Sequence, residues 1–160
     1  MKIRWLLLPL CLCCLLGFAD TQVEKLHFKK NGYSIAPLEG LAIGTVYQPL
    51  MMFLPGTENS IQNVGVQIQP YDGTMEEYDA MSMDQFKQLN FKMIKANKID
   101  KNTITYEYTG TMQERSLHWY TKAIKKGAQV YLATASVTED QWAAIATKMK
   151  ACVDSFELDK

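Results

Sequence analysis

The last third of the chain, residues 102–156, constrains the fold more than any other stretch. Three segments rich in β-branched and aromatic residues are separated by short polar turns: Thr103–Met112, Leu117–Lys125 and Gln129–Val137. Their alternation predicts three strands of an antiparallel meander. The third segment is apolar on both sides, which predicts a central strand that is covered on both faces of the sheet.

An amphipathic helix is predicted directly after this meander. Thr138-Glu139-Asp140-Gln141 has the residues of a capping box, with Thr138 as the cap and Gln141 as its partner. Apolar residues then recur along one helical stripe: Trp142, Ile145, Ala146, Met149, Cys152, Val153 and Phe156. The stripe predicts a helix with one face buried.

Further strands are predicted in the first half of the chain and just before the meander. Asn31-Gly32 predicts a hairpin whose second strand includes Tyr33–Ile35. Ile61–Gln69 alternates as a strand with one buried face, and Met93–Ile99 is predicted to pair with the meander.

A helical region is predicted between these last two strands. Thr74 and Ser82 each begin a capping-box pattern, which predicts two short helices that end near Asn90. The order of elements favours an α+β domain with a largely antiparallel sheet and helices packed on its faces.

The beginning of the chain has the three-part pattern of a secretory signal peptide. Lys2 and Arg4 precede an uncharged run of 14 residues, Trp5–Phe18, which is shorter than the ~20 apolar residues that span a bilayer. Small residues precede Asp20, so we expect cleavage after Ala19 and a protein that is periplasmic or secreted. A membrane anchor and a lipoprotein stay open as alternatives, although none of the three cysteines in this run follows a small residue.

Cleavage of residues 1–19 would leave one domain, residues 20–160. The signal carries two of the 17 basic residues and none of the 17 acidic ones, so the mature chain has 15 basic and 17 acidic residues and a net charge of −2. This balance does not indicate a nucleic acid or a strongly anionic membrane as partner. Cys152 would be the only remaining cysteine, which rules out an intramolecular disulfide in the mature chain.

Several motifs of the mature chain occur together in a known family. They are Gly32-Tyr33-Ser34-Ile35, the strand Asn63-Val64-Gly65-Val66, the meander, and the ending Cys152-Val153-Asp154-Ser155-Phe156. In this combination, over about residues 26–157, the chain resembles the PsbP-like and DcrB-like proteins. The resemblance implies an α/β/α sandwich with a central antiparallel sheet, and a binding or assembly factor with no family-wide catalytic residues. We also expect no metal and no cofactor, because no motif for either is present. The signal peptide favours the envelope members of this group.

Few residues are candidates for chemistry. His27 and His118 are the only histidines, and no H-x-x-x-H or H-E-x-x-H spacing is present. His118 is interpreted as a structural strand histidine, with an envelope hydrolase as the alternative if it shares a pocket with a carboxylate or a hydroxyl. Cys152 lies on the apolar stripe of the last helix and is interpreted as a small buried hydrophobic residue, with a reactive thiol, intermolecular pairing and metal capture as the alternatives.

Methionines suggest one metal hypothesis. Met75, Met81 and Met83 lie in a polar helical segment, where exposed thioethers would suit Cu(I). The alternative is that these flexible side chains fill the core or form an adaptable binding surface.

Taken together, the sequence favours an exported, non-catalytic envelope factor that binds a protein or peptide. The surfaces we expect to bind are the loop Glu39–Gln48 and the helical segment Thr74–Gln85, because loops and exposed methionines cluster there. A hydrolase that uses His118 and a Cu(I)-binding protein remain the alternatives.

Overall fold

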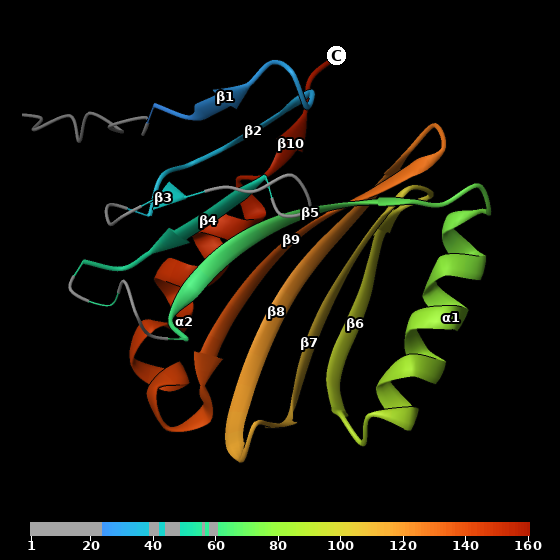
Figure 1. Cartoon of the computed structure of the whole chain (residues 1–160). Helices are drawn as coiled ribbons and strands as arrows, with labels where there is room; N and C mark the ends of the chain where they lie inside the picture. Colours follow the sequence, from blue (N-terminus) through green and yellow to red (C-terminus); the bar gives the residue numbers. More distant parts are fainter. Residues whose placement is uncertain (1–23, 39–41, 44–48, 56, 58–60) are drawn as a thin grey trace, which may run out of the picture.

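A computed structural model describes residues 24–38, 42–43, 49–55, 57 and 61–160. The predicted signal peptide and most of the loop 39–48 lie outside these residues. The described residues contain two helices, α1 (Met75–Gln88) and α2 (Glu139–Asp154), and ten strands (Figure 1). The strands are β1 (Leu26–Phe28), β2 (Tyr33–Ile35), β3 (Ala42–Ile43), β4 (Leu50–Phe53), β5 (Asn63–Pro70), β6 (Lys92–Asp100), β7 (Thr103–Met112), β8 (Arg115–Lys126), β9 (Gln129–Thr138) and β10 (Glu157–Leu158).

Seven of these strands form one antiparallel sheet in the order β3-β4-β5-β9-β8-β7-β6. The predicted meander is confirmed as β7-β8-β9, and β6 pairs with β7 as the sequence indicated. β9 lies in the middle of the sheet, between β5 and β8. Its apolar residues on both sides therefore have a physical reason, because each face of a central strand is covered.

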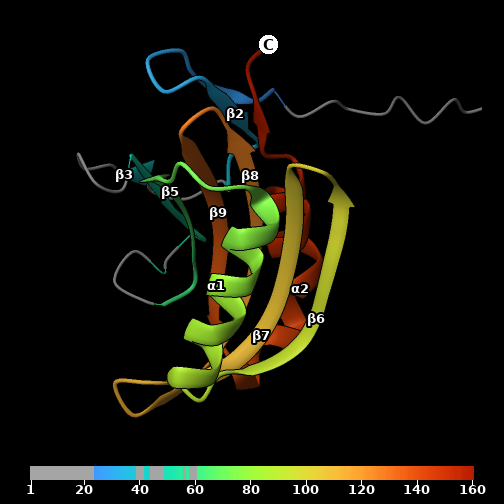
Figure 2. The same cartoon turned by 90° about the vertical axis from the view of Figure 1, so that its right-hand side faces the viewer.

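The two helices cover opposite faces of the sheet. Alternate residues of β9 show this, since Val130 and Leu132 belong to the apolar cluster under α1 while Ala133 and Ala135 belong to the cluster under α2. In Figure 2, α1 lies in front of β7, β8 and β9, and α2 lies behind them. The predicted α+β fold with helices on the sheet faces is confirmed.

The α2 face holds the larger core. The predicted stripe is confirmed, because Met149, Val153 and Phe156 are fully buried and Trp142 and Cys152 nearly so. A second sheet, β1-β2-β10, closes onto the same cluster through residues that include Tyr33 and Ile35. The Asn31-Gly32 turn that starts β2 is confirmed, and Gly32 adopts φ +70°, a conformation that favours glycine.

One prediction about α1 is confirmed and one is wrong. The capping box at Thr74 forms. The Thr74 hydroxyl accepts a hydrogen bond from the Glu77 backbone N–H at 3.2 Å, and the Thr74 backbone N–H donates to Glu77 Oε2 at 2.7 Å. Ser82 does not start a second helix. It lies inside α1, where its hydroxyl donates to the Tyr78 carbonyl at 2.8 Å, a bond that serine makes without leaving a helix.

The predicted capping box of α2 is also wrong in its bonding. Thr138 does occupy the N-cap position, but its hydroxyl makes no capping hydrogen bond to the backbone. It donates to Gln141 Oε1 at 2.8 Å instead. The two side chains that were expected to cap the backbone bond to each other instead. The pattern therefore predicted the start of α2 correctly but not the hydrogen bonds made there.

Candidate functional site

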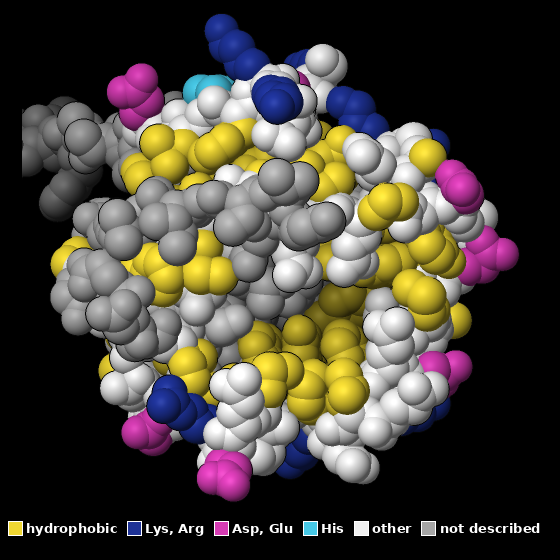
Figure 3. All heavy atoms as spheres, in the orientation of Figure 1, with side chains coloured by type: hydrophobic (Ala, Val, Ile, Leu, Met, Phe, Trp, Pro, Cys, Tyr) yellow, Lys and Arg dark blue, Asp and Glu magenta, His cyan; other side chains and the backbone are white. Residues whose placement is uncertain are grey.

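A groove of about 360 Å³ lies between α1 and the sheet. The space-filling view shows this face hollowed, with hydrophobic side chains on the floor of the hollow (Figure 3). β5 builds one side, because every second residue of a strand faces the same way. The groove is lined by Asn63, Gly65, Gln67, Gln69, Tyr78, Ser82, Gln85, Phe86, Tyr106, Tyr108, Met112, Trp119, Thr121, Leu132, Thr134 and Ser136.

The described lining of the groove carries no Lys, Arg, Asp, Glu or His, although the first four make up 21% of the chain. Its tyrosines are also neutral at physiological pH. Burial raises the pKa of Tyr78 to about 12 and also raises the pKa of Tyr108. The groove is therefore polar but uncharged.

Some polar groups of the groove bond to one another and others do not. The Tyr78 hydroxyl donates to Gln69 Oε1 at 2.9 Å, and the hydroxyls of Thr121 and Thr134 are 3.0 Å apart. By contrast, the side chains of three lining residues make no hydrogen bond to any other residue that the structure describes: Gln67, Gln85 and Ser136. These amides and this hydroxyl can donate to and accept from a ligand.

A row of aromatic rings borders the groove. Phe86 stacks on Tyr108 with ring centroids 4.5 Å apart, and Tyr108 stacks on Trp119 at 5.2 Å. Phe91 extends the row, 4.9 Å from Trp119. The Phe91 ring can lie against β7 only because residue 110 is glycine, since a Cβ at position 110 would lie 2.3 Å from this ring. Side chains packed in this way hold their rings in place.

Exposed apolar side chains lie beside the groove. We call Met81, Leu89 and Met112 the apolar rim. They are 38%, 57% and 47% exposed, and they are three of the five large hydrophobic residues that the described chain leaves exposed. Met81 and Leu89 are four residues before and after Gln85, so they share its side of α1.

His118 lies on the other face of the sheet in a buried charged cluster. The ring is 3% exposed and stacks on Trp142, with centroids 4.0 Å apart. Its Nδ1 is 2.8 Å from Glu139 Oε2 and its Nε2 is 3.1 Å from Glu107 Oε1. Each ring nitrogen of His118 therefore has a carboxylate oxygen within hydrogen-bond distance, and the tautomer decides which nitrogen donates.

Lys150 completes this cluster. Its ammonium donates to Glu107 Oε2 at 2.8 Å and lies 5.2 Å from the centroid of the Tyr120 ring. Burial favours the neutral form of Glu107, but hydrogen bonds from Lys150 and His118 outweigh burial and leave its pKa below the usual value. The side chains of His118, Glu107, Glu139 and Lys150 therefore tie α2 to β7 and β8.

This geometry does not favour the hydrolase hypothesis. His118 does share its site with carboxylates, as that hypothesis required, but both ring nitrogens are already bonded to them. The ring does not line any of the cavities described here. A general base needs a free nitrogen within reach of a substrate proton.

The three methionines of the Cu(I) hypothesis do not converge. Met75 is only 2% exposed and packs under α1, so the expectation that it would be exposed is wrong. Met81 faces solvent, and Met83 is half-buried against the α1 cluster. Residues 75 and 81 lie on different sides of a helix, because six residues turn it by about 240°.

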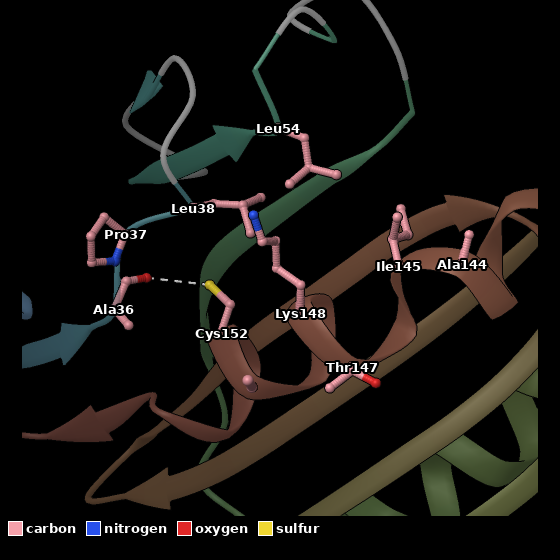
Figure 4. Close-up of a pocket in the computed structure, with 10 residues that line it drawn as sticks. Ala36, Pro37, Leu38, Leu54, Ala144, Ile145, Thr147, Lys148 and Cys152 are labelled. Carbon is pink, nitrogen blue, oxygen red and sulfur yellow. Dashed lines mark hydrogen bonds between the residues drawn. The ribbon is translucent and has the colours of Figure 1, made fainter. Parts of the chain in front are cut away.

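The largest described cavity, about 700 Å³, lies beside α2 and is mostly apolar (Figure 4). Leu38, Leu54 and Ile145 contribute to its lining, and Lys148 also borders it. Cys152 is buried beside it, with its Sγ 3.3 Å from the Ala36 carbonyl, and burial raises the pKa of this thiol to about 12. A thiol with so high a pKa is a poor nucleophile, in line with the predicted packing role.

Sequence reasoning proposed the segment Thr74–Gln85 as a binding surface but missed the groove beneath it. Asn63, Gln67 and Gln69 read as the solvent side of a half-buried strand. The signal that could have revealed the groove is that this side carries three amides and Gly65, with no charge over four alternate positions. The other predicted surface, Glu39–Gln48, lies largely outside the described residues.

Neither described helix is long and apolar enough to cross a membrane.

Similarity to known proteins is confined to structure. No protein-family model and no curated protein sequence matches the chain. The fold is similar to that of CyanoP, the cyanobacterial PsbP of Synechocystis sp. PCC 6803, with a TM-score of 0.62 and 15% identity over 89% of this chain and 95% of that one. It is also similar to PA94 of Pseudomonas aeruginosa, a protein of unknown function (TM-score 0.53, 14% identity, 79% and 90% covered). LpqN of Mycobacterium tuberculosis, described as involved in cell envelope biogenesis, is a third (TM-score 0.54, 9% identity, 86% and 90% covered). These similarities confirm the PsbP-like fold that the sequence predicted.

Proposed function

We propose that the protein is an exported, non-catalytic binding or assembly factor of the cell envelope, with a protein or peptide as its partner. The observation that carries this proposal is the apolar rim. Leu89 and Met112 keep about half of their surface in water, although burying apolar surface is favourable by about 25 cal/mol per Å². A partner that covers the rim would recover this free energy.

The chemistry of the rim suits a protein partner. Two of its three residues are methionines, whose flexible thioether side chains adapt to the shape of a partner. Exposed hydrophobic residues that gather beside a groove are typical of interaction sites, whereas single scattered ones need no explanation. The rim also belongs in part to the helical segment that the sequence favoured.

Two further observations support a location in the cell envelope and a non-catalytic role. LpqN, which has a similar fold, is described as involved in cell envelope biogenesis, and the first 19 residues of this chain have the pattern of a signal peptide. The buried histidine, the one side chain with catalytic potential that the sequence singled out, is bonded at both ring nitrogens.

Affinity capture with rim variants tests the proposal. The tagged mature protein and a Met81→Gln/Leu89→Gln double variant would be compared on envelope extracts. We expect the partner to be recovered with the unmodified protein and to be reduced at least about tenfold with the double variant, because two apolar anchors are lost.

Ile99→Gln is the matched control. Ile99 is 54% exposed, like the rim residues, but it lies near the far end of β6 and outside the rim. Recovery should be unchanged with this variant. Equal recovery with the double variant and the control would contradict a partner site at the rim.

A further inference from the structure

We propose that the groove between α1 and the sheet binds an uncharged saccharide. This site adjoins the apolar rim and shares Met112 with it, but it uses the polar and aromatic lining of the groove. Its chemistry follows from three properties of the lining: the absence of charge, the unused hydrogen-bonding groups and the row of aromatic rings.

The absence of charge excludes ionised ligands. A phosphate, carboxylate or ammonium that entered the groove would lose water and find no opposite charge among the described lining residues. The carboxylate of Asp79, which contacts the lining residue Tyr106, already accepts a hydrogen bond from the Tyr106 hydroxyl at 2.9 Å. A ligand without formal charge meets no such cost.

The unused polar groups match a ligand rich in hydroxyls. Gln67 on β5, Gln85 on α1 and Ser136 on β9 approach the groove from three different elements. Each amide offers both donors and an acceptor, as each sugar hydroxyl does. A purely apolar ligand would leave these groups without partners, which costs free energy once water is excluded.

The aromatic rings provide the apolar half of the site. Trp119 and Tyr108 lie nearly parallel, with an interplanar angle of 22°, and both line the groove. A sugar ring presents C–H groups on its faces and hydroxyls around its edge. The stacked rings cover much of one another's faces, so the surface that they leave on the groove is a rigid apolar wall. Such a wall next to amides suits a sugar ring, because the C–H groups of the sugar pack against the wall while the amides bond its hydroxyls.

An extended peptide fits the groove less well. Peptides that bind to sheets pair their backbone with an exposed edge strand. The edges of the seven-stranded sheet are β3 and β6, whereas the groove is lined by the inner strands β5, β7, β8 and β9. The floor of the groove therefore offers side chains and no free backbone ladder.

The size of the groove limits the ligand. A volume of about 360 Å³ lies at the lower end of the ~300–1,000 Å³ range of small-molecule sites. It suits a few sugar rings and not a folded chain.

NMR titration with short oligosaccharides tests the proposal. Three probes are uncharged: maltotriose, cellotriose and the fully N-acetylated chitotriose. Two probes are charged counterparts: deacetylated chitotriose, which is cationic, and trigalacturonate, which is anionic. The mature chain carries two tryptophans, so the indole N–H signal of Trp119 reports the groove while that of Trp142, on the other face of the sheet, is an internal control. We expect at least one uncharged trisaccharide to shift Trp119 and the amides of Gln67 and Gln85, and to leave Trp142 unchanged.

A pair of charge variants sharpens this test. Gln67→Glu places a carboxylate in the groove with little change of shape, and Gln88→Glu does the same on α1 outside it. The first should weaken saccharide binding about tenfold, because a donor is lost and a charge must be desolvated, and the second should leave it within about twofold.

Several results would overturn the proposal. They are the absence of shifts with all three uncharged trisaccharides at their solubility limits, equal binding of the charged counterparts, or equal effects of the two variants. Binding of an uncharged peptide such as an Asn/Gln/Ser pentapeptide amide, without any saccharide binding, would assign the groove to peptides. None of these results concerns Met81 or Leu89, so the proposed function is tested separately.

Discussion

The two faces of the seven-stranded sheet use their side chains in different ways. On the α2 face, apolar residues from both sheets and the helix are buried, and the Glu107 carboxylate bonds to both His118 and Lys150. On the α1 face, a smaller cluster holds the helix, and beside it uncharged amides, aromatic rings and exposed methionines remain. The difference indicates that the α2 face stabilises the fold and that the α1 face is available for binding.

The location of charge shows the same division. On the α2 face, the mostly buried Glu107 carboxylate accepts from Lys150 and is 3.1 Å from His118, as a buried charge requires. The groove contains no charged group in its described lining, yet it leaves hydrogen-bonding groups unused. Four predictions follow from this comparison, in order of decreasing effect.

Truncation of the α2-face core should have the largest effect on stability. Phe156 is fully buried and 5.3 Å from the Tyr33 ring, so Phe156→Ala should lower the free energy of unfolding by about 3–5 kcal/mol. Phe86→Ala on the α1 face should cost roughly half as much, because Phe86 is only partly buried. Urea unfolding followed by circular dichroism measures both, and the reverse order would contradict the comparison.

Loss of the Glu107 carboxylate should have the next largest effect. Glu107→Gln keeps one acceptor oxygen but replaces the other with an NH2 donor and removes the charge, so it cannot accept from both Lys150 and His118, and we expect it to cost about 1–3 kcal/mol at pH 7. Asp84→Asn is the control, because its contact with Lys87 at 3.5 Å is exposed and contributes little. Equal unfolding midpoints for the two variants would show that the buried cluster is not needed for stability.

The effect of Glu107→Gln should also depend on pH. The pKa of Glu107 is lower in the folded protein than in the unfolded chain, so its contribution to stability is present above the unfolded pKa and is lost as pH falls through the folded pKa. The difference between wild type and Glu107→Gln should therefore be larger at neutral pH than in strong acid. Unfolding curves across this range measure it, and a constant difference would contradict the assigned pKa direction.

Substitutions in the groove should have the smallest effect on stability. Gln67 is exposed and its side chain bonds to no other described residue, so Gln67→Ala should change the free energy of unfolding by less than about 0.5 kcal/mol. The same change should reduce binding to the groove. A cost of several kcal/mol would mean that the groove is part of the stabilising structure, and the comparison of the two faces would be wrong.

Much of the fold could be predicted because its elements have strong local patterns. The alternation of apolar residues predicted the meander and the central position of β9, and their helical spacing predicted the stripe of α2. Ser82 was misassigned as a helix start because serine can either cap a new helix or bond to a carbonyl inside a continuous one. Only packing against the sheet decides between these two positions, and here Ser82 bonds to the Tyr78 carbonyl inside α1.

The candidate site could be predicted only in part. The groove and the charged cluster each join residues far apart in the chain, such as Gln67 with Ser136 and Glu107 with Lys150. The sheet order β5-β9-β8-β7 brings them together, and no local pattern encodes that order. The sequence could identify an uncharged side of β5, but not the helix that closes a groove over it.

Photo-cross-linking in cells tests the central claim most directly, because it records contacts of the intact protein. A photoreactive amino acid would replace Leu89 beside the groove or Ala143 on α2, both of which are exposed. Our account predicts a cross-linked partner from position 89 and none from position 143. A cross-link from position 143 alone, or equal cross-links from both positions, would contradict the assignment of binding to the α1 face.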